Sequence, residues 1–200
     1  MDISDLAASL RKKLGRKKRM MIAIVGAPGA GKSTLSEQLY KELGPSAVVV
    51  PMDGFHFDDV ILNARGDRAR KGAPHTFDVL GFEALLKRIK ACETDIAIPV
   101  FDRAQELSRA GAAIINAQMK FIIVEGNYLL LKQKPWNRLK RLFDVTVFIK
   151  VPEAELERRL VARWRGFGFD EASAKAKALG NDIPNARVVV AHSAKADVVV

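Results

Sequence analysis

Residues 26–33 read Gly26-Ala27-Pro28-Gly29-Ala30-Gly31-Lys32-Ser33 and fit the Walker A pattern G-x-x-x-x-G-K-[ST] at every position. Glycines let such a loop curl, so that successive backbone N–H groups converge on phosphate oxygens. We expect Lys32 to bridge the β- and γ-phosphates of ATP and the Ser33 hydroxyl to hold Mg²⁺. The predicted nucleotide site therefore consists of Gly26, Ala27, Pro28, Gly29, Ala30, Gly31, Lys32, Ser33 and Thr34.

The context of this loop is that of a phosphate-binding site. An apolar run, Met20–Val25, precedes it and predicts a buried strand, and a helical pattern, Lys32–Leu43, follows it. The positive end of that helix dipole would add to the attraction for phosphate. The motif predicts triphosphate binding without saying what happens to the phosphate.

Strand-like and helical patterns alternate along the rest of the chain, which indicates an α/β domain with a mostly parallel sheet flanked by helices, as in the P-loop NTPase fold. The polar stretch 53–76 is longer than most loops that only connect two elements, so we expect it to have a function. Further strands are predicted at Ala47–Met52, Ile96–Val100, Phe121–Val124, Leu142–Lys150, Val188–Ala191 and Asp197–Val200, one side of a hairpin at Ala112–Ala117, and helices at Asp2–Lys18, Leu80–Ala91, Glu153–Arg165 and Asp170–Leu179.

Length and composition suit one domain. The chain has 200 residues, of which 48% are hydrophobic and 28% charged, and no apolar stretch approaches the ~20 residues that span a bilayer. The first ten residues lack the basic-then-apolar order of a signal peptide, so a cytoplasmic location is expected. The single cysteine, Cys92, excludes an internal disulfide. We divide the chain into a basic N-terminal helix, 1–19, and a P-loop domain, 20–200.

Charge is uneven. The net charge is +10, and seven basic residues lie within Arg11–Arg19. Such a run can hold nucleic acid or an anionic membrane, or it can be the solvated face of a helix. No aromatic residue interleaves it to stack on bases, so neither nucleic acid nor a membrane is expected as a partner. A small-molecule substrate is the expected partner, and a homodimer is left open.

Other motifs narrow the class of NTPase. The guanine-binding N-K-x-D motif and the L-S-G-G-Q signature of ABC-type ATPases are both absent from the sequence. Asp53 follows the apolar run 48–50, at the strand end where open parallel sheets bind ligands. There a carboxylate can accept the proton of an attacking hydroxyl, as kinase aspartates do, or merely cap the next turn.

Taken together, several segments resemble the phosphoribulokinase, uridine kinase and pantothenate kinase group of P-loop kinases. The fragment 181–187 is similar to bacterial members labelled fructose transport-system kinases. The resemblance spans about residues 20–190. It rests on the Walker A loop, Met52-Asp53-Gly54-Phe55-His56, Arg70-Lys71-Gly72-Ala73-Pro74-His75-Thr76-Phe77-Asp78, Pro99-Val100-Phe101-Asp102-Arg103, Ile123-Val124-Glu125-Gly126-Asn127-Tyr128 and Asn181-Asp182-Ile183-Pro184-Asn185-Ala186-Arg187.

This resemblance implies roles for particular residues. Asp53 matches the aspartate that activates the acceptor, and Glu125 matches the acidic residue near Mg²⁺. The implied acceptor pocket is lined by Phe55, His56 and Phe101. Arg163 and Arg165 fall in the arginine-bearing lid, beside possible hinge glycines, although arginines on a helix also make a solvated face. Asn185 is expected either to contact the adenine edge or to form a turn.

One departure from the family concerns the acceptor. Uridine kinases continue the Tyr-Asp segment differently, whereas here Arg103 follows Phe101-Asp102, which puts a nucleoside acceptor in doubt. Basic residues between Asp53 and Arg109 suit an anionic acceptor or a solvated loop. We expect an ATP- and Mg²⁺-dependent kinase that phosphorylates a hydroxyl of a small metabolite, such as fructose or a sugar phosphate. The alternatives are a regulatory P-loop NTPase and a nucleoside or pantothenate kinase.

Overall fold

Strand β1 (Met20–Gly26) is the centre of a five-stranded parallel sheet in the computed structural model, which describes residues 2–200. The strand order is β2 (Ala47–Pro51), β5 (Phe121–Gly126), β1, β6 (Val145–Ile149) and β7 (Val198–Val199). All four pairings are parallel, and Val25 lies opposite both Gly126 and Phe148. The carboxyl ends of the long strands therefore share one edge, and the predicted α/β fold is confirmed.

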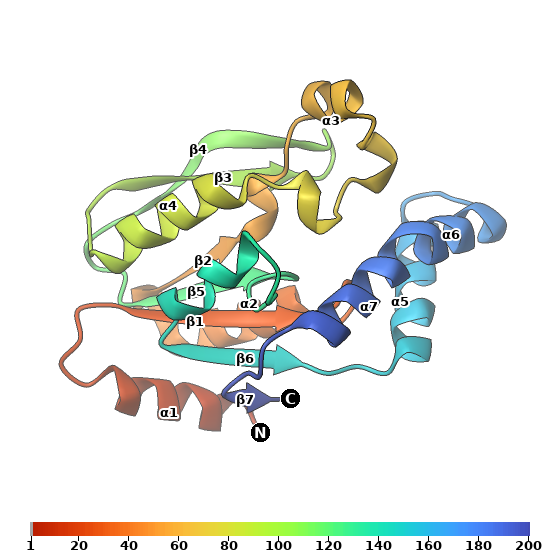
Figure 1. Ribbon diagram of the computed structural model, residues 1–200. Helices are drawn as coiled ribbons and strands as arrows, with labels where there is room; N and C mark the ends of the chain where they lie inside the picture. Colours follow the sequence, from red (N-terminus) through yellow and green to blue (C-terminus); the bar gives the residue numbers. More distant parts are fainter. Residues whose placement is uncertain (1) are drawn as a thin grey trace.

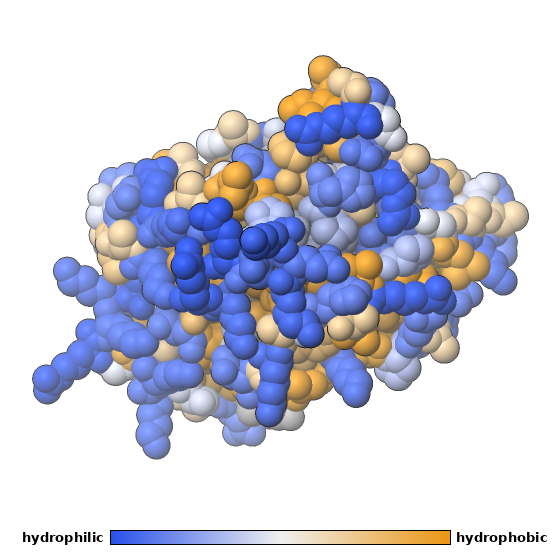
Figure 2. Space-filling model, viewed as in Figure 1, coloured by the Kyte–Doolittle hydropathy of each residue, from blue (hydrophilic) through white to orange (hydrophobic). Residues whose placement is uncertain are grey.

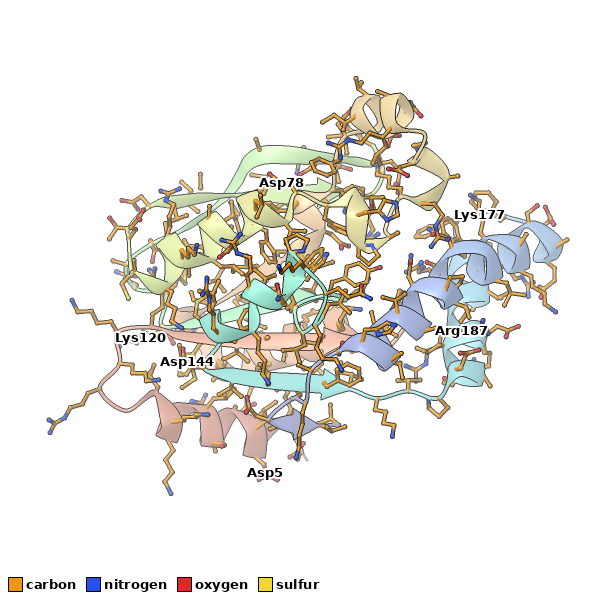
Figure 3. All side chains as sticks on the ribbon, in the orientation of Figure 1. Asp5, Asp78, Lys120, Asp144, Lys177 and Arg187 are labelled. Carbon is orange, nitrogen blue, oxygen red and sulfur yellow. The ribbon has the colours of Figure 1, made fainter. Side chains whose placement is uncertain are left out.

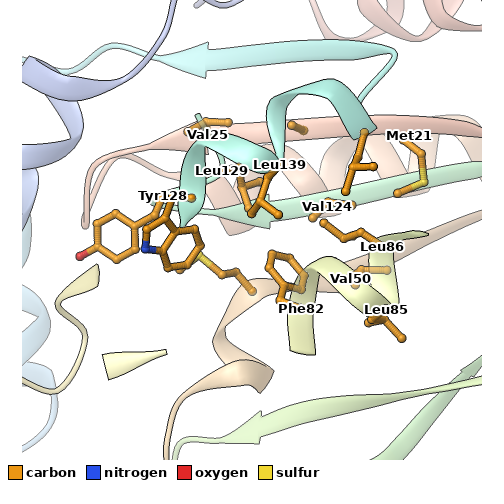
Figure 4. Packing of buried hydrophobic residues seen from close by; sticks show 14 of the residues in the cluster. Met21, Val25, Val50, Phe82, Leu85, Leu86, Val124, Tyr128, Leu129 and Leu139 are labelled. Carbon is orange, nitrogen blue, oxygen red and sulfur yellow. The ribbon is translucent and has the colours of Figure 1, made fainter. Parts of the chain in front are cut away.

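Two layers of helices cover this sheet because β1 is apolar on both faces (Figure 1). Met20, Ile22 and Ile24 pack with α1 (Ile3–Leu14) and α2 (Lys32–Leu43) on one face. The intervening Met21, Ala23 and Val25 pack with α4 (Val79–Lys90) and α7 (Ile183–His192) on the other. Figure 4 shows Phe82 and Leu86 of α4 lying against Val124 of β5 in this second cluster.

Two further groups of elements lie outside the main sheet, one beside α4 and one beyond the carboxyl ends of the strands (Figure 1). An antiparallel hairpin of β3 (Ile96–Asp102) and β4 (Leu107–Ile115) confirms the expected hairpin, and α3 (Asp59–Arg65) lies next to it. The sequence did not predict α3, which lies within the stretch read as a loop. Opposite, α5 (Glu153–Gly166) and α6 (Glu171–Lys177) form an arm joined to α7 by a π-helical turn, Ala178–Asp182.

The strand predicted at Val188–Ala191 is wrong, since these residues belong to α7. The valine run favoured a strand, but the buried positions Ile183, Ala186 and Val189 recur every three residues. That is the spacing of one helix face, so burial of this face outweighs the β propensity of valine.

The basic N-terminal segment is integrated into the fold within its described residues, 2–19. Leu6, Ala7 and Leu10 of α1 are buried, while most of the charged residues face solvent, as on the hydrophilic surface in Figure 2. Arg19 is different, because it is 8% exposed and donates to four carbonyls, those of Ile89, Glu93, Asn116 and Met119. Lys17 pairs at 2.8 Å with Asp144, which Figure 3 labels.

Between residues 2 and 200, no helix is long and apolar enough to cross a membrane.

Candidate active site

The phosphate loop connects β1 to α2 and is shaped by its glycines. Gly29 and Gly31 have φ of 79° and 94°, a region that disfavours residues with a Cβ. At Gly26 a Cβ would lie 3.1 Å from the carbonyl oxygen of Ile149. Gly31 caps α2 without a side-chain hydrogen bond, so no side chain occupies the first N–H groups of α2 in the described chain. Those groups are free to receive phosphate oxygens.

Lys32 lies beneath this loop. Its Nζ donates a 3.0 Å hydrogen bond to the Ala27 carbonyl. Burial lowers its pKa to about 8, against the opposing effect of the Asp53 and Glu125 carboxylates. The ammonium is thus an incompletely compensated charge under the loop, and triphosphate oxygens would supply the missing anion.

Glu125, at the end of β5, is the second acidic residue near the loop. Its Oε1 accepts a 3.3 Å hydrogen bond from Ser33 Oγ, and its Oε2 is buried with no partner in residues 2–200. Burial raises the pKa of Glu125. A hydroxyl beside an unpartnered carboxylate oxygen fits a hard cation such as Mg²⁺. The described part of the chain holds no cluster of three His, Cys, Asp or Glu side chains, so nucleotide and water oxygens would complete the shell.

Asp53 lies in a 3-10 turn, Met52–Phe55, directly after β2. The β2–β5 register places Pro51 opposite Glu125, which brings Asp53 to the edge where the phosphate loop begins. Asp53 Oδ2 accepts a 2.6 Å hydrogen bond from Arg103 Nη2 at the end of β3. No cap by this carboxylate is recorded for the turn in residues 2–200, so the capping alternative has no support.

The predicted acceptor residues divide into two sets. His56 and Phe101 line the cleft with Asp53 and Arg103, and their rings lie 4.8 Å apart. Phe55 does not line it, because its ring packs 4.7 Å from that of Phe82 on the edge of the core. In this tight turn, successive side chains point to different sides, which the sequence alone could not resolve.

His56 is held in a defined protonation state. Its Nδ1 lies 2.8 Å from the Asp53 carbonyl, which can only accept, so Nδ1 carries a proton. Burial lowers the pKa of His56, which favours the neutral ring. Nε2 of a neutral ring with this tautomer is an acceptor for a hydroxyl group.

The arm supplies arginines to the opposite wall. Arg163 Nη2 lies 3.2 Å from Asp182 Oδ1 and lines the cleft, as predicted. Arg165 does not line it, because it points to the other side of α5 and pairs with Glu171 at 3.1 Å. Arg159 belongs to the same arginine-bearing segment, although Arg163 and Arg165 were the preferred candidates, and its Nη1 lies 3.4 Å from the Gly29 carbonyl. Helical spacing was the available signal, since Arg159 and Arg163 are four residues apart and share a face.

Asn185 takes part in hydrogen bonds within the protein that the sequence did not predict. Its side chain is 2% exposed and accepts from Arg70 Nη2 at 3.3 Å, while Asn181 Nδ2 donates to the Lys71 carbonyl at 2.8 Å. Arg70 Nη1 also donates to the Gly180 carbonyl at 3.0 Å. These contacts link the π-helical turn to the segment 68–72, while Asn185 still lines the cleft. The expected adenine contact stays a prediction.

One cleft of about 1110 Å³ joins these parts. Its volume is enough for a nucleotide with a small second substrate. Lys177 of α6, labelled in Figure 3, lies over the rings of Trp164 and Phe169 at the arm side of the cleft. The predicted site residues that line it are Pro28, Gly29, Gly31, Lys32, Ser33, Thr34, Asp53, His56, Phe101, Arg103, Glu125, Arg163 and Asn185.

Comparisons with known proteins agree with this geometry. A family model described as an AAA domain matches residues 21–180. The solved structure of a proposed fructose transport system kinase from Silicibacter sp. TM1040 has a TM-score of 0.95 and 41% identity, and the match covers 100% of this chain and 99% of that one.

Two curated relatives match over most of the chain. The uncharacterized protein YggC of Escherichia coli is 34% identical over 190 residues, which are 92% of this chain and 78% of the relative. A proposed uridine kinase of Schizosaccharomyces pombe is 31% identical over 198 residues, covering 93% and 84% respectively.

Proposed function

Because the chain belongs to the P-loop kinases of the phosphoribulokinase, uridine kinase and pantothenate kinase type, we propose that it transfers the γ-phosphate of ATP to a hydroxyl group of a small metabolite. One observation carries the proposal. The Asp53 carboxylate lines the same cleft as the phosphate loop, on the wall opposite the arm. A slow regulatory NTPase has no need of a carboxylate placed for a second substrate.

Each part of the cleft has a task in this reaction. The loop N–H groups and the N-terminus of α2 hold the phosphates, and Lys32 exchanges the Ala27 carbonyl for phosphate oxygens. Ser33 and Glu125 would hold Mg²⁺, which would neutralise negative charge on the phosphates. Arg163 adds positive charge from the arm, where closure would exclude water.

The acceptor hydroxyl is oriented by Asp53, and His56 Nε2 can accept a hydrogen bond from a second hydroxyl of the substrate. The hydroxyl oxygen forms the new bond to phosphorus as the bond to the β,γ-bridging oxygen breaks, and ADP leaves. The hydroxyl proton passes to the Asp53 carboxylate and then to solvent. Sugars and sugar phosphates are the first acceptors to examine, since relatives are named as fructose-system and uridine kinases.

The test is an Asp53→Asn substitution, which keeps the size and one acceptor oxygen but removes the charge. Loss of a general base typically costs ~10²–10⁴-fold in rate, so kcat for the acceptor should fall by that order while ATP affinity changes little. Asp78→Asn is the matched control, because Asp78 caps α4 through the Gly81 N–H, outside the cleft. A stable Asp53→Asn protein with wild-type transfer rates would remove Asp53 from the mechanism.

A further inference from the structure

The ion pair between Arg103 and Asp53 occupies the carboxylate that the proposed reaction requires. The guanidinium Nη2 lies 2.6 Å from Asp53 Oδ2. Arg103 is held at this place by a turn in which Asp102 Oδ1 accepts from the backbone N–H groups of Ala104 and Gln105, at 3.0 and 3.2 Å. This turn fixes the backbone at the end of β3, from which Arg103 reaches Asp53.

Other cations on this side of the cleft have partners that the reaction does not need. Lys71 is 9% exposed and donates to Asp59 and to the Glu106 carbonyl. Arg68 also pairs with Asp59, at 2.6 Å. Arg70 is engaged by the π-helical turn. Arg103 alone among these cations has Asp53 as its recorded ion-pair partner in residues 2–200, and its side chain is 61% exposed.

An ion pair of this kind works against general-base chemistry. The guanidinium holds Asp53 Oδ2, so this oxygen is not open to the proton of an acceptor hydroxyl. A neutral alcohol has no anionic group that could replace Asp53 as the partner of Arg103. A carboxylate or phosphate on the acceptor offers a planar, bidentate partner that suits a guanidinium better than a single carboxylate oxygen does.

We propose that Arg103 is the receptor for an anionic group of the acceptor, and that its transfer from Asp53 to this group releases Asp53 to accept the hydroxyl proton. This inference rests on the proposed function and narrows its substrate to an anionic alcohol. Since the two side chains touch, the anionic group and the reacting hydroxyl lie within a few bonds of each other in the substrate. Small hydroxy carboxylates and phosphorylated sugars have this arrangement.

The aromatic floor of the pocket supports the assignment. The Phe101 ring lies between two cations, with Arg103 Cζ at 5.8 Å and Lys71 Nζ at 5.3 Å from its centre. His56 contacts the same ring. A guanidinium that moves from Asp53 to a ligand can keep its position near this ring, so the exchange needs a small rotation and no change of the β3–β4 hairpin.

The experiment compares two pairs of matched acceptors that differ in one anionic group, namely glycerol with glycerate and fructose with fructose 6-phosphate. The variants are Arg103→Gln and Arg103→Lys, and the control is Arg109→Gln, from the same hairpin but paired with Asp102. For the wild type we expect kcat/KM at least about 10-fold higher for the anionic member of a pair. In Arg103→Gln, KM for that member should rise about 10- to 100-fold, the size expected for one hydrogen-bonded charge pair, while the neutral member changes less than about 3-fold.

A second readout needs no acceptor. Because Arg103→Gln frees Asp53, ATP hydrolysis by water should rise about 3- to 10-fold over wild type, with Arg103→Lys between the two. Transfer to neutral acceptors that equals or exceeds transfer to their anionic partners overturns the inference and leaves the kinase proposal standing. Failure of the wild type to phosphorylate any alcohol counts against the kinase proposal, and unchanged acceptor-free hydrolysis in Arg103→Gln then overturns the inference as well.

Discussion

Replacing Lys32 with methionine should stabilise the protein while abolishing its nucleotide chemistry. Burial lowers the pKa of Lys32 from 10.5 to about 8. At 1.36 kcal/mol per pKa unit, holding this ammonium in its charged form costs at most about 3 kcal/mol. Methionine removes that cost but loses the hydrogen bond to Ala27, worth about 1 kcal/mol. The net gain is about 2 kcal/mol at pH 7, or about 4–8 °C in Tm for a chain of this length.

The pH dependence of the unfolding free energy shows whether the charged Lys32 side chain destabilises the folded state. The folded pKa lies below the unfolded one, so the unfolded wild type binds more protons between about pH 8 and 10.5, and its stability rises with pH across that window. The advantage of Lys32→Met should be complete below about pH 8 and fade above it. Thermal and urea unfolding at pH 7 and pH 10 measure this, with Lys41→Met on the same helix, paired to Glu37 at the surface, as control. A Lys32→Met protein less stable than wild type at pH 7, or an equal gain at both pH values, would refute the reasoning.

Three further substitutions test separate parts of the structure. Arg19→Ala should cost about 3 kcal/mol or more in urea unfolding because four carbonyls lose a charged donor, whereas Lys18→Ala, at the exposed neighbour, should stay within about 0.5 kcal/mol. Glu125→Gln should raise the Mg²⁺ concentration for half-maximal rate about 10- to 100-fold, and an unchanged metal requirement would exclude Glu125 from the site. Asn185→Ala should cost about 1–2 kcal/mol in urea unfolding, because Arg70 loses an acceptor, and should leave ATP affinity within about 2-fold; weakened ATP binding at unchanged stability would support the adenine contact.

Local patterns predicted most of the fold. The phosphate loop, its strand and its helix follow from backbone rules that act within about twenty residues, so Lys32–Leu43 was predicted to the residue. Apolar runs likewise located β2, β5 and β6 to within a few residues. Helix α3 was missed because Leu62 is the one buried residue among its seven, so it shows no amphipathic pattern. Helix α7 was predicted as a strand because its helical state depends on a tertiary contact. Helix α7 exists because one of its faces is buried against β1 and α5, which no local propensity reveals.

The sequence predicted most of the residues of the site but few of the contacts between them. The position of Asp53 after a strand sufficed to assign it to the carboxyl edge of the sheet, whereas Glu125 and Arg163 were assigned from the family resemblance. Arg159 and Arg165 lie on different sides of α5. Leu156 and Leu160 pack on the phosphate loop and so determine which side of α5 faces the cleft. The engagement of Asn185 by Arg70 joins residues 115 positions apart, and no pattern in the sequence signals it.

Transfer of label from γ-³²P ATP tests the kinase account most directly, with the wild type and Asp53→Asn run side by side. The account predicts that label appears in an added alcohol in step with ADP release, and that Asp53→Asn loses this transfer about 10²–10⁴-fold while still binding ATP. ADP release that is indifferent to every alcohol, with all of the label in inorganic phosphate, would contradict it and favour a regulatory NTPase.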